Sequence, residues 1–231
     1  MARGLSLVAG GGSRAVGKHP LVTGLGEPFC LPAPPQPTLS ELFTASARDG
    51  GWAGFLLPQL DAAKPLLWVQ ERMAIVEAGR VHPAELGLAE LIHVEARDAR
   101  DALWAMEEGL RCASLSAVIG EIRGDPAVLD FTATRRLAVA AERSGVPCWL
   151  ARLGGTANLS GARMRWRIAS GPSLAHLFNP KAPGSPAWDA ELFRARGFAP
   201  GRWSVAHEAD RFRLLPPSGD RALEENERSA A

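Results

Sequence analysis

Short apolar runs recur between residues 39 and 152, and each is too short to form a buried helix. The runs cover residues 39–43, 65–69, 91–94, 115–122 and 147–152. Runs of this length, bounded by polar or Gly/Pro-rich segments, are typical of strands buried on both faces of a sheet. They predict five central strands.

Segments of helical composition separate these runs. A helix or a turn is expected at residues 76–90, and helices are expected at residues 52–57, 98–112 and 131–144. The last is the clearest, because Thr132 or Thr134 can cap its first turn and Gly145 supplies a left-handed stop. Strands that alternate with helices predict an α/β fold, in which a mostly parallel sheet is flanked by helices.

The pattern changes after Gly154 and Gly155. From there the chain alternates basic and apolar residues in segments separated by Pro and Gly turns, which predicts an antiparallel C-terminal extension of the sheet at residues 154–215. We expect the α/β core at residues 39–153. A flexible Gly/Pro-rich arm is expected at residues 1–38 and a disordered tail at residues 216–231.

Composition limits the class of protein. The 231 residues are 46% hydrophobic with a formal net charge of +1, which suits one globular core and disfavours a dedicated nucleic-acid-binding protein. No apolar run reaches the roughly 20 residues that a membrane helix needs, so a cytoplasmic protein is expected. The three cysteines and five histidines have no metal-binding spacing, so no metal site is expected.

Two segments partly match a phosphate-binding loop. Residues 12–19 nearly fit G-x-x-x-x-G-K-[ST], but His19 cannot supply the hydroxyl for Mg²⁺ and no helix follows, so we interpret the match as chance. The loop at residues 44–51 lies between a predicted strand and a predicted helix but has no lysine. Its candidate nucleotide-binding residues are Ser46, Arg48, Gly50 and Gly51.

Glu121 stands near the carboxyl end of the strand predicted at residues 115–122. Open α/β sheets place their chemistry at the carboxyl ends of strands, so Glu121 is a candidate catalytic acid. The alternative is a strand-end carboxylate that is paired with an arginine.

Residues 163–168 alternate arginine with apolar side chains, which puts three guanidinium groups on one face of a strand. This face predicts a contact with a phosphate backbone or with a partner protein. The candidate DNA- or partner-binding residues are Arg163, Arg165, Arg167, Arg135 and Arg136. The alternative is a solvated strand face above a buried Trp166.

Four segments, in this order, carry a family resemblance: residues 103–111, 118–121, 132–142 and 164–168. Together they resemble the ImuA family, the RecA-like accessory proteins of the bacterial damage-induced mutagenesis cassette. The resemblance runs from about Leu39 to Leu214 and implies a RecA-like core. In that core the loop at residues 44–51 takes the place of the phosphate loop. Glu71 corresponds to a strand-end acid of recombinases, and Glu121 to the aspartate on the Mg²⁺ side.

The resemblance also implies a function. It implies a non-catalytic accessory subunit of SOS-induced error-prone translesion DNA synthesis. Its expected partners are an ImuB-like polymerase homologue and an error-prone DnaE-type polymerase, with RecA and DNA as further candidates. Two alternatives stay open. One is a divergent RecA-like ATPase that uses ATP, Mg²⁺, Glu121 and the 44–51 loop, and the other is a single-stranded DNA-binding protein that uses the 163–167 face.

Overall fold

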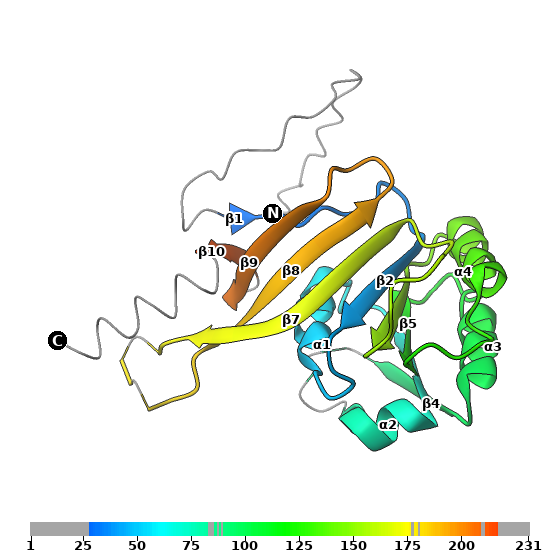
Figure 1. Ribbon diagram of the computed structural model, residues 1–231, viewed down its shortest axis with the longest axis horizontal. Coiled ribbons are helices and arrows are strands. Elements are labelled where there is room, and N and C mark those ends of the chain that lie inside the picture. Colours follow the sequence, from blue (N-terminus) through cyan, green and yellow to red (C-terminus); the bar gives the residue numbers. More distant parts are fainter. Residues whose placement is uncertain are drawn as a thin grey trace, which may run out of the picture.

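The computed structural model describes residues 28–216, apart from residues 83–85, 87, 89, 177, 180 and 209–210 (Figure 1). Most of the arm expected at residues 1–38, the tail after residue 216 and the partial phosphate-loop match at residues 12–19 lie outside the described residues. Within the described part, no helix has the length and the apolar character needed to span a membrane.

A ten-stranded sheet runs through the molecule in the order β1-β10-β9-β8-β7-β2-β6-β5-β3-β4. The parallel half consists of β4 (Leu91–Ala96), β3 (Leu66–Glu71), β5 (Ala117–Arg123), β6 (Cys148–Leu153), β2 (Leu39–Thr44) and the first part of β7 (Met164–Leu174). The antiparallel half continues from β7 through β8 (Ser185–Ala195), β9 (Gly201–Glu208), β10 (Arg211–Leu215) and β1 (Pro28–Phe29). The predicted α/β class with an antiparallel C-terminal extension is confirmed.

Helices cover both faces of the parallel half (Figure 1). One face carries α3 (Ala99–Gly109) and α4 (Phe131–Ser144), and the other carries α1 (Gly51–Leu56) with the 3₁₀ turn η1 (Leu57–Gln59). The helix or turn expected at residues 76–90 overlaps a helix only at its start. Helix α2 covers Arg72–Ala78 and directly follows β3, and the described residues between 79 and 90 are not helical.

The N-terminal cap of α4 also differs from the prediction. Asp130 caps this helix, and its side chain accepts a hydrogen bond from the Ala133 amide at 2.7 Å. Thr134 is buried and its hydroxyl donates to the Asp130 carbonyl, so neither predicted threonine is the cap. The stop at Gly145 is confirmed, with a left-handed φ of 73°.

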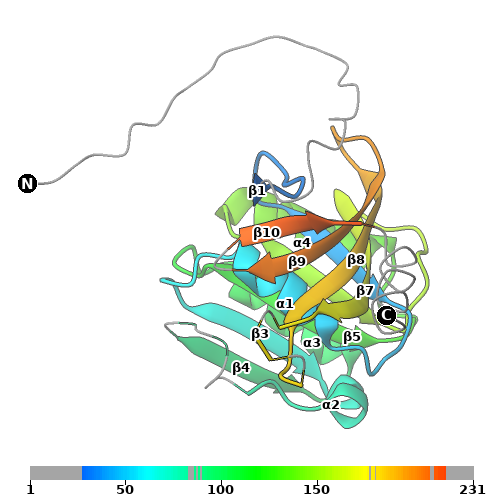
Figure 2. The same cartoon turned by 90° about the vertical axis from the view of Figure 1, so that its left-hand side faces the viewer.

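The antiparallel strands curl around α1 and share its core, as Figure 2 shows from the side. The ring of Phe55 on α1 lies 5.7 Å from the rings of Trp166 and Phe212 and 6.5 Å from that of Trp188. The boundary expected between residues 153 and 154 therefore falls between two strands of one sheet.

The connection from β6 to β7 contains no helix and crosses β2. Strands β6 and β7 both run parallel to β2, one on each side of it, so residues 154–163 must return across one face of the sheet. Gly161 in this crossover packs so closely on α4 that an added Cβ would lie 2.6 Å from the Cα of Arg135. The Gly161 amide also donates to the hydroxyl of Thr134 at 2.9 Å. The crossover thus covers β2 on the side of α3 and α4, from Gly154 at its last residue to Arg163 at its first.

Candidate functional site

The loop between β2 and α1 uses its polar groups within the protein. One carboxylate oxygen of Asp49 accepts hydrogen bonds from the Gly51 amide at 3.0 Å and from the Ser170 hydroxyl at 2.8 Å. Its other oxygen accepts from the Ser170 amide at 3.3 Å. The carboxylate therefore lies at the start of α1, where a phosphate group would need free amides and no negative charge. Helix α1 is also only six residues long.

Strands β7 and β8, which come late in the sequence, contact this loop. A Cβ added at Gly51 would lie 2.0 Å from the hydroxyl oxygen of Ser170, and the indole of Trp188 donates to the Gly51 carbonyl at 2.6 Å. Gly51 is thus a close-packing position. The other three candidate nucleotide-binding residues, Ser46, Arg48 and Gly50, are exposed.

Replacing Asp49 with alanine should lower the free energy of unfolding by about 2 kcal/mol, because the Gly51 amide and two donors of Ser170 lose their acceptor. Urea unfolding followed by tryptophan fluorescence measures this loss. The control is Asp49→Asn, which keeps one acceptor oxygen and should lose about half as much. Equal stability of the wild type and both variants would contradict this account of the loop.

Glu121 is buried and bonded to protein donors. One carboxylate oxygen accepts from the indole of Trp68 at 2.5 Å and from the side-chain amide of Gln70 at 3.0 Å. The side-chain oxygen of Gln70 accepts a hydrogen bond from the amide of Val81 at 2.9 Å. The same oxygen lies 2.9 Å from Nε2 of His93. Burial raises the pKa of Glu121 to about 7, and these two hydrogen bonds only partly offset that rise.

Glu71 is the last residue of β3 and is also buried. Its carboxylate accepts a hydrogen bond from the Arg123 amide at 2.9 Å. The neighbouring Gln70 is in register with Glu121, and successive side chains of a strand alternate in direction. The two candidate acids therefore point to opposite faces of the sheet and do not share one site. Among the described residues, no three His, Cys, Asp or Glu side chains form a metal-binding cluster.

The predicted face of three solvated arginines is wrong for Arg165, which is 3% exposed. The crossover at residues 154–163 covers the face that the alternating pattern assigned to solvent. Each arginine has a carboxylate partner. Arg163 pairs with Glu142 at 2.8 Å, Arg165 with Glu41 at 2.6 Å and Arg167 with Glu191 at 2.9 Å.

The other two candidate arginines lie on α4. Arg136 pairs with Glu107 of α3, and both side chains are at the surface. Arg135 is exposed beside the crossover, and the described residues provide no ion pair for it. Of the five candidate arginines, Arg135 is therefore the one with a free charge.

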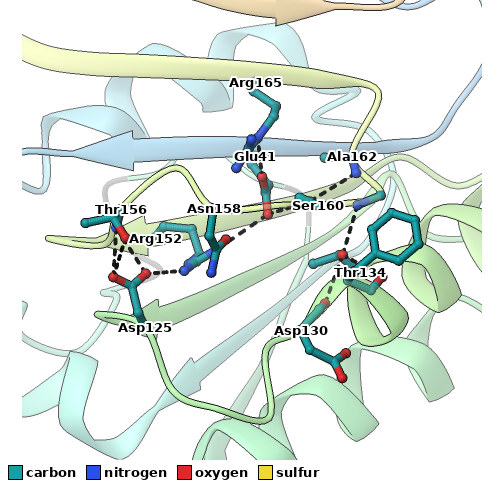
Figure 3. Close-up of polar contacts among 12 residues, drawn as sticks. Glu41, Asp125, Asp130, Thr134, Arg152, Thr156, Asn158, Ser160, Ala162 and Arg165 are labelled. Atoms are coloured by element: carbon teal, nitrogen blue, oxygen red, sulfur yellow. Dashed lines mark hydrogen bonds and ion pairs between the residues drawn. The ribbon is translucent and has the colours of Figure 1, made fainter.

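A buried charge cluster, which the sequence analysis did not find, joins β2, β6 and β7 (Figure 3). Glu41 and Arg152 are fully buried. One oxygen of Glu41 accepts from Arg165, and the other lies 3.6 Å from Arg152 and accepts from the Ser160 hydroxyl at 3.0 Å. The signal in the sequence was a single charge inside each of two apolar strands.

The cluster extends to the loops at the carboxyl ends of β5 and β6. Arg152 pairs with Asp125, whose carboxylate also accepts hydrogen bonds from the amide and the hydroxyl of Thr156 (Figure 3). The guanidinium groups of Arg152 and Arg165 lie 5.5 and 5.1 Å from the ring centroid of Phe43. These contacts attach the crossover to the sheet. They also pair the charged groups of the cluster with partners inside the protein.

A cleft of about 1200 Å³ opens beside the end of β2. Phe43 and Trp203 contribute aromatic walls, and Leu214 contributes an aliphatic one. Arg167 and Arg202 both pair with Glu191, at 2.9 and 3.0 Å. This lining can bind a ligand or a partner, and within it the Ser204 hydroxyl donates to the carboxylate of Asp189 at 2.5 Å.

Comparison with known proteins identifies the family. No model of a known protein family matches the chain. Two relatives, each named Protein ImuA and found in two strains of Caulobacter vibrioides, are 34% identical to the chain over 174 residues. The match covers 67% of this chain and 67% of each relative. Identity of this level over two thirds of both chains is the basis for our conclusion that the protein belongs to the ImuA family.

Proposed function

We propose that the protein is a non-catalytic accessory subunit of SOS-induced, error-prone translesion DNA synthesis. In this role it links an ImuB-like polymerase homologue to an error-prone DnaE-type polymerase in the cytoplasm. RecA and DNA are further candidate partners. Membership of the ImuA family supports the setting in damage-induced mutagenesis.

The proposal that the subunit is not catalytic rests on the structure of the loop at residues 44–51. It has no lysine, and the Asp49 carboxylate accepts hydrogen bonds from the Gly51 amide and from Ser170 where a phosphate would need donors. The two candidate acids support the same conclusion, because Glu121 and Glu71 lie on opposite faces of the sheet and each accepts hydrogen bonds from the protein. A fold that keeps its sheet without the phosphate contacts is suited to scaffolding.

The test combines nucleotide binding with assembly. Calorimetric titration of the purified protein with ATP and Mg²⁺ should give no saturable binding, while co-expression with the two polymerase partners should yield a complex that co-purifies. Mg²⁺-dependent ATP turnover that Glu121→Gln abolishes would establish the divergent ATPase instead. Absence of the complex would contradict the linking role.

A direct role in DNA binding has a separate test. Reversing the surface arginines Arg163 and Arg167 to glutamate should leave the affinity for single-stranded DNA unchanged, because both charges are already paired with carboxylates. Arg165 is left intact in this variant because it is buried. Loss of a salt-sensitive affinity on reversal would show that the strand binds the phosphate backbone.

A further inference from the structure

Strands β7 and β8 continue beyond the rest of the sheet as a two-stranded arm, residues 169–186, which projects from the body of the molecule (Figure 1). In the described part of the chain, β7 pairs with β2 only as far as Arg167, and β8 pairs with β9 only from Ala187 onward. None of the described residues of the arm is buried. A hairpin without a core of its own depends on local contacts for its conformation.

Side chains of the arm itself fix the backbone at its tip. Nδ1 of His176 accepts hydrogen bonds from the amides of Phe178 and Asn179, at 3.3 and 3.1 Å. The side-chain oxygen of Asn179 accepts a hydrogen bond from the Lys181 amide at 3.1 Å. The backbone on both sides of Phe178 is therefore ordered before a partner binds.

Phe178 stands at this tip with 91% of its surface exposed. This is the largest exposed fraction of any large apolar side chain in the part of the chain that the structure describes. An aromatic ring contributes a large apolar area when it is covered, and a ring on an ordered backbone loses little conformational entropy on binding. The ring is thus suited to anchor an interface.

The charge of the arm has one sign. Residues 169–186 contain no acidic residue, and Lys181 is their one charged side chain, since Nδ1 of His176 acts as an acceptor. Lys181 is exposed, and the described residues provide no ion pair for it. The carboxylate of Asp49 contacts the arm at Ser170, near its base. A pocket that fits this tip therefore has an apolar interior and a carboxylate on its rim.

Two other occupants fit the tip less well. Nucleic acid needs several phosphate contacts for affinity, and the tip offers one free cation, because the three arginines of residues 163–167 are paired with carboxylates. The cleft beside β2 in a second copy is lined by two arginines and two acids, so its charges sum to zero and do not attract Lys181. A two-fold contact between tips would bring two Lys181 side chains together.

We propose that the tip of the β7–β8 arm inserts Phe178 into an apolar pocket of a partner protein, where Lys181 faces a carboxylate on the rim of that pocket. The inference rests on the proposed function, because the arm then supplies the contact through which this subunit binds one of its two polymerase partners. It assigns that contact to a part of the molecule that neither the family membership nor the sheet identifies.

Biolayer interferometry of the full-length protein against the purified ImuB-like homologue and the purified DnaE-type polymerase tests this contact. Phe178→Ala should weaken binding to one of the two about 30-fold, as expected when an anchoring aromatic residue is removed. Lys181→Glu should weaken the same interaction about tenfold, and this difference should shrink at high salt.

Two variants of His176 test whether the order of the tip matters. His176→Ala should weaken the same interaction, because the amides of Phe178 and Asn179 lose their acceptor and the tip must be ordered on binding. His176→Asn keeps a side-chain oxygen that can accept these hydrogen bonds, so it should bind as the wild type does. All the substituted side chains are exposed, so thermal unfolding should remain at the wild-type temperature.

The matched control is Trp104→Ala on α3, which removes another exposed aromatic side chain and should leave the affinity unchanged. Unchanged affinity of Phe178→Ala for a polymerase that the wild type binds would overturn the inference and leave the proposed function standing. Absence of wild-type binding to either polymerase would overturn both.

Two further results would assign the tip to a different occupant and would also overturn the inference. One is an affinity of the wild type for single-stranded DNA that Phe178→Ala abolishes while polymerase binding is retained. The other is head-to-tail self-association of the wild type in sedimentation velocity that Phe178→Ala abolishes, since a contact between a tip and another surface of a second copy does not close on itself.

Discussion

Replacing Glu41 with alanine is expected to lower the free energy of unfolding by about 3–5 kcal/mol. The substitution leaves the guanidinium group of Arg165 buried without its carboxylate and removes one of the two acids beside Arg152. Glu41 and Arg152 are 0% exposed and Arg165 is 3% exposed, so water cannot replace the missing partner. An uncompensated buried charge is among the largest single-residue effects on protein stability.

Urea unfolding at neutral pH measures this loss, with Glu191→Ala as the control. Glu191 also forms ion pairs with two arginines, Arg167 and Arg202, but the side chains of these arginines are 51% and 81% exposed. Solvent screens these pairs, so the control should lose less than about 1 kcal/mol. Similar urea midpoints for the two variants would contradict the assignment of Glu41 as the centre of a buried cluster.

The cluster as a whole has a different expected effect from its central acid. Replacing Glu41 with leucine and both Arg152 and Arg165 with methionine removes the buried charges together, and such replacements are often neutral or stabilising. The same variant loses the hydrogen bond from Ser160 to Glu41 that fastens the crossover. Its amides at residues 154–163 should therefore exchange with solvent faster than in the wild type, even if the stability of the fold is retained.

The strands and helices of this fold were predictable because the local signals agree with the packing. Apolar runs became β2, β3, β4, β5 and β6, and Gly145 takes the left-handed conformation that stops α4. The cap of α4 was assigned wrongly because Thr132 and Thr134 lie in the apolar-periodic segment. Asp130 stands just before that segment, and its carboxylate accepts a hydrogen bond from the Ala133 amide. Local chemistry was thus sufficient for these strands and for the stop of α4, but not for the bounds of α2 or for the cap of α4.

The charge cluster could not be predicted, because it depends on contacts that are remote in the sequence. The alternation at residues 163–168 predicts a solvent-exposed face only if no other segment packs on that face. In this fold the crossover at residues 154–163 packs on it. Glu41 and Arg165 lie 124 residues apart in the chain, and Asp49 and Ser170 lie 121 residues apart. A missing lysine at residues 44–51 is visible in the sequence, whereas the carboxylate that accepts hydrogen bonds from this loop is visible only in the fold.

Replacing Glu121 with glutamine should remove a pH dependence from the stability of the protein. Burial raises the pKa of Glu121 from its ordinary value of 4.5 to about 7, so the folded state binds the proton more tightly than the unfolded state. The stabilisation is fully present below pH 4.5 and is lost as the pH rises to about 7. The linked change in the free energy of unfolding is about 3 kcal/mol.

Urea unfolding of the wild type and of Glu121→Gln at a series of pH values from 4.5 to 8 measures this effect. Glutamine has nearly the same shape and keeps an oxygen that accepts from Trp68 and Gln70, but it cannot ionise. The variant should therefore be the more stable protein at pH 8, and its curve should lack the decline of about 3 kcal/mol. Parallel curves for the two proteins would contradict the raised pKa.

A second variant tests the cause of the pKa. Trp68→Phe removes one of the two hydrogen bonds that lower the pKa of Glu121, so the pH range of the decline should move upward. The packing defect left by the smaller ring lowers stability at every pH and does not move that range. Geometry bears on the function more directly. Glu121 accepts hydrogen bonds from Trp68 and Gln70, and the other candidate acid, Glu71, points to the opposite face of the sheet, which is why we favour the scaffold over the divergent ATPase.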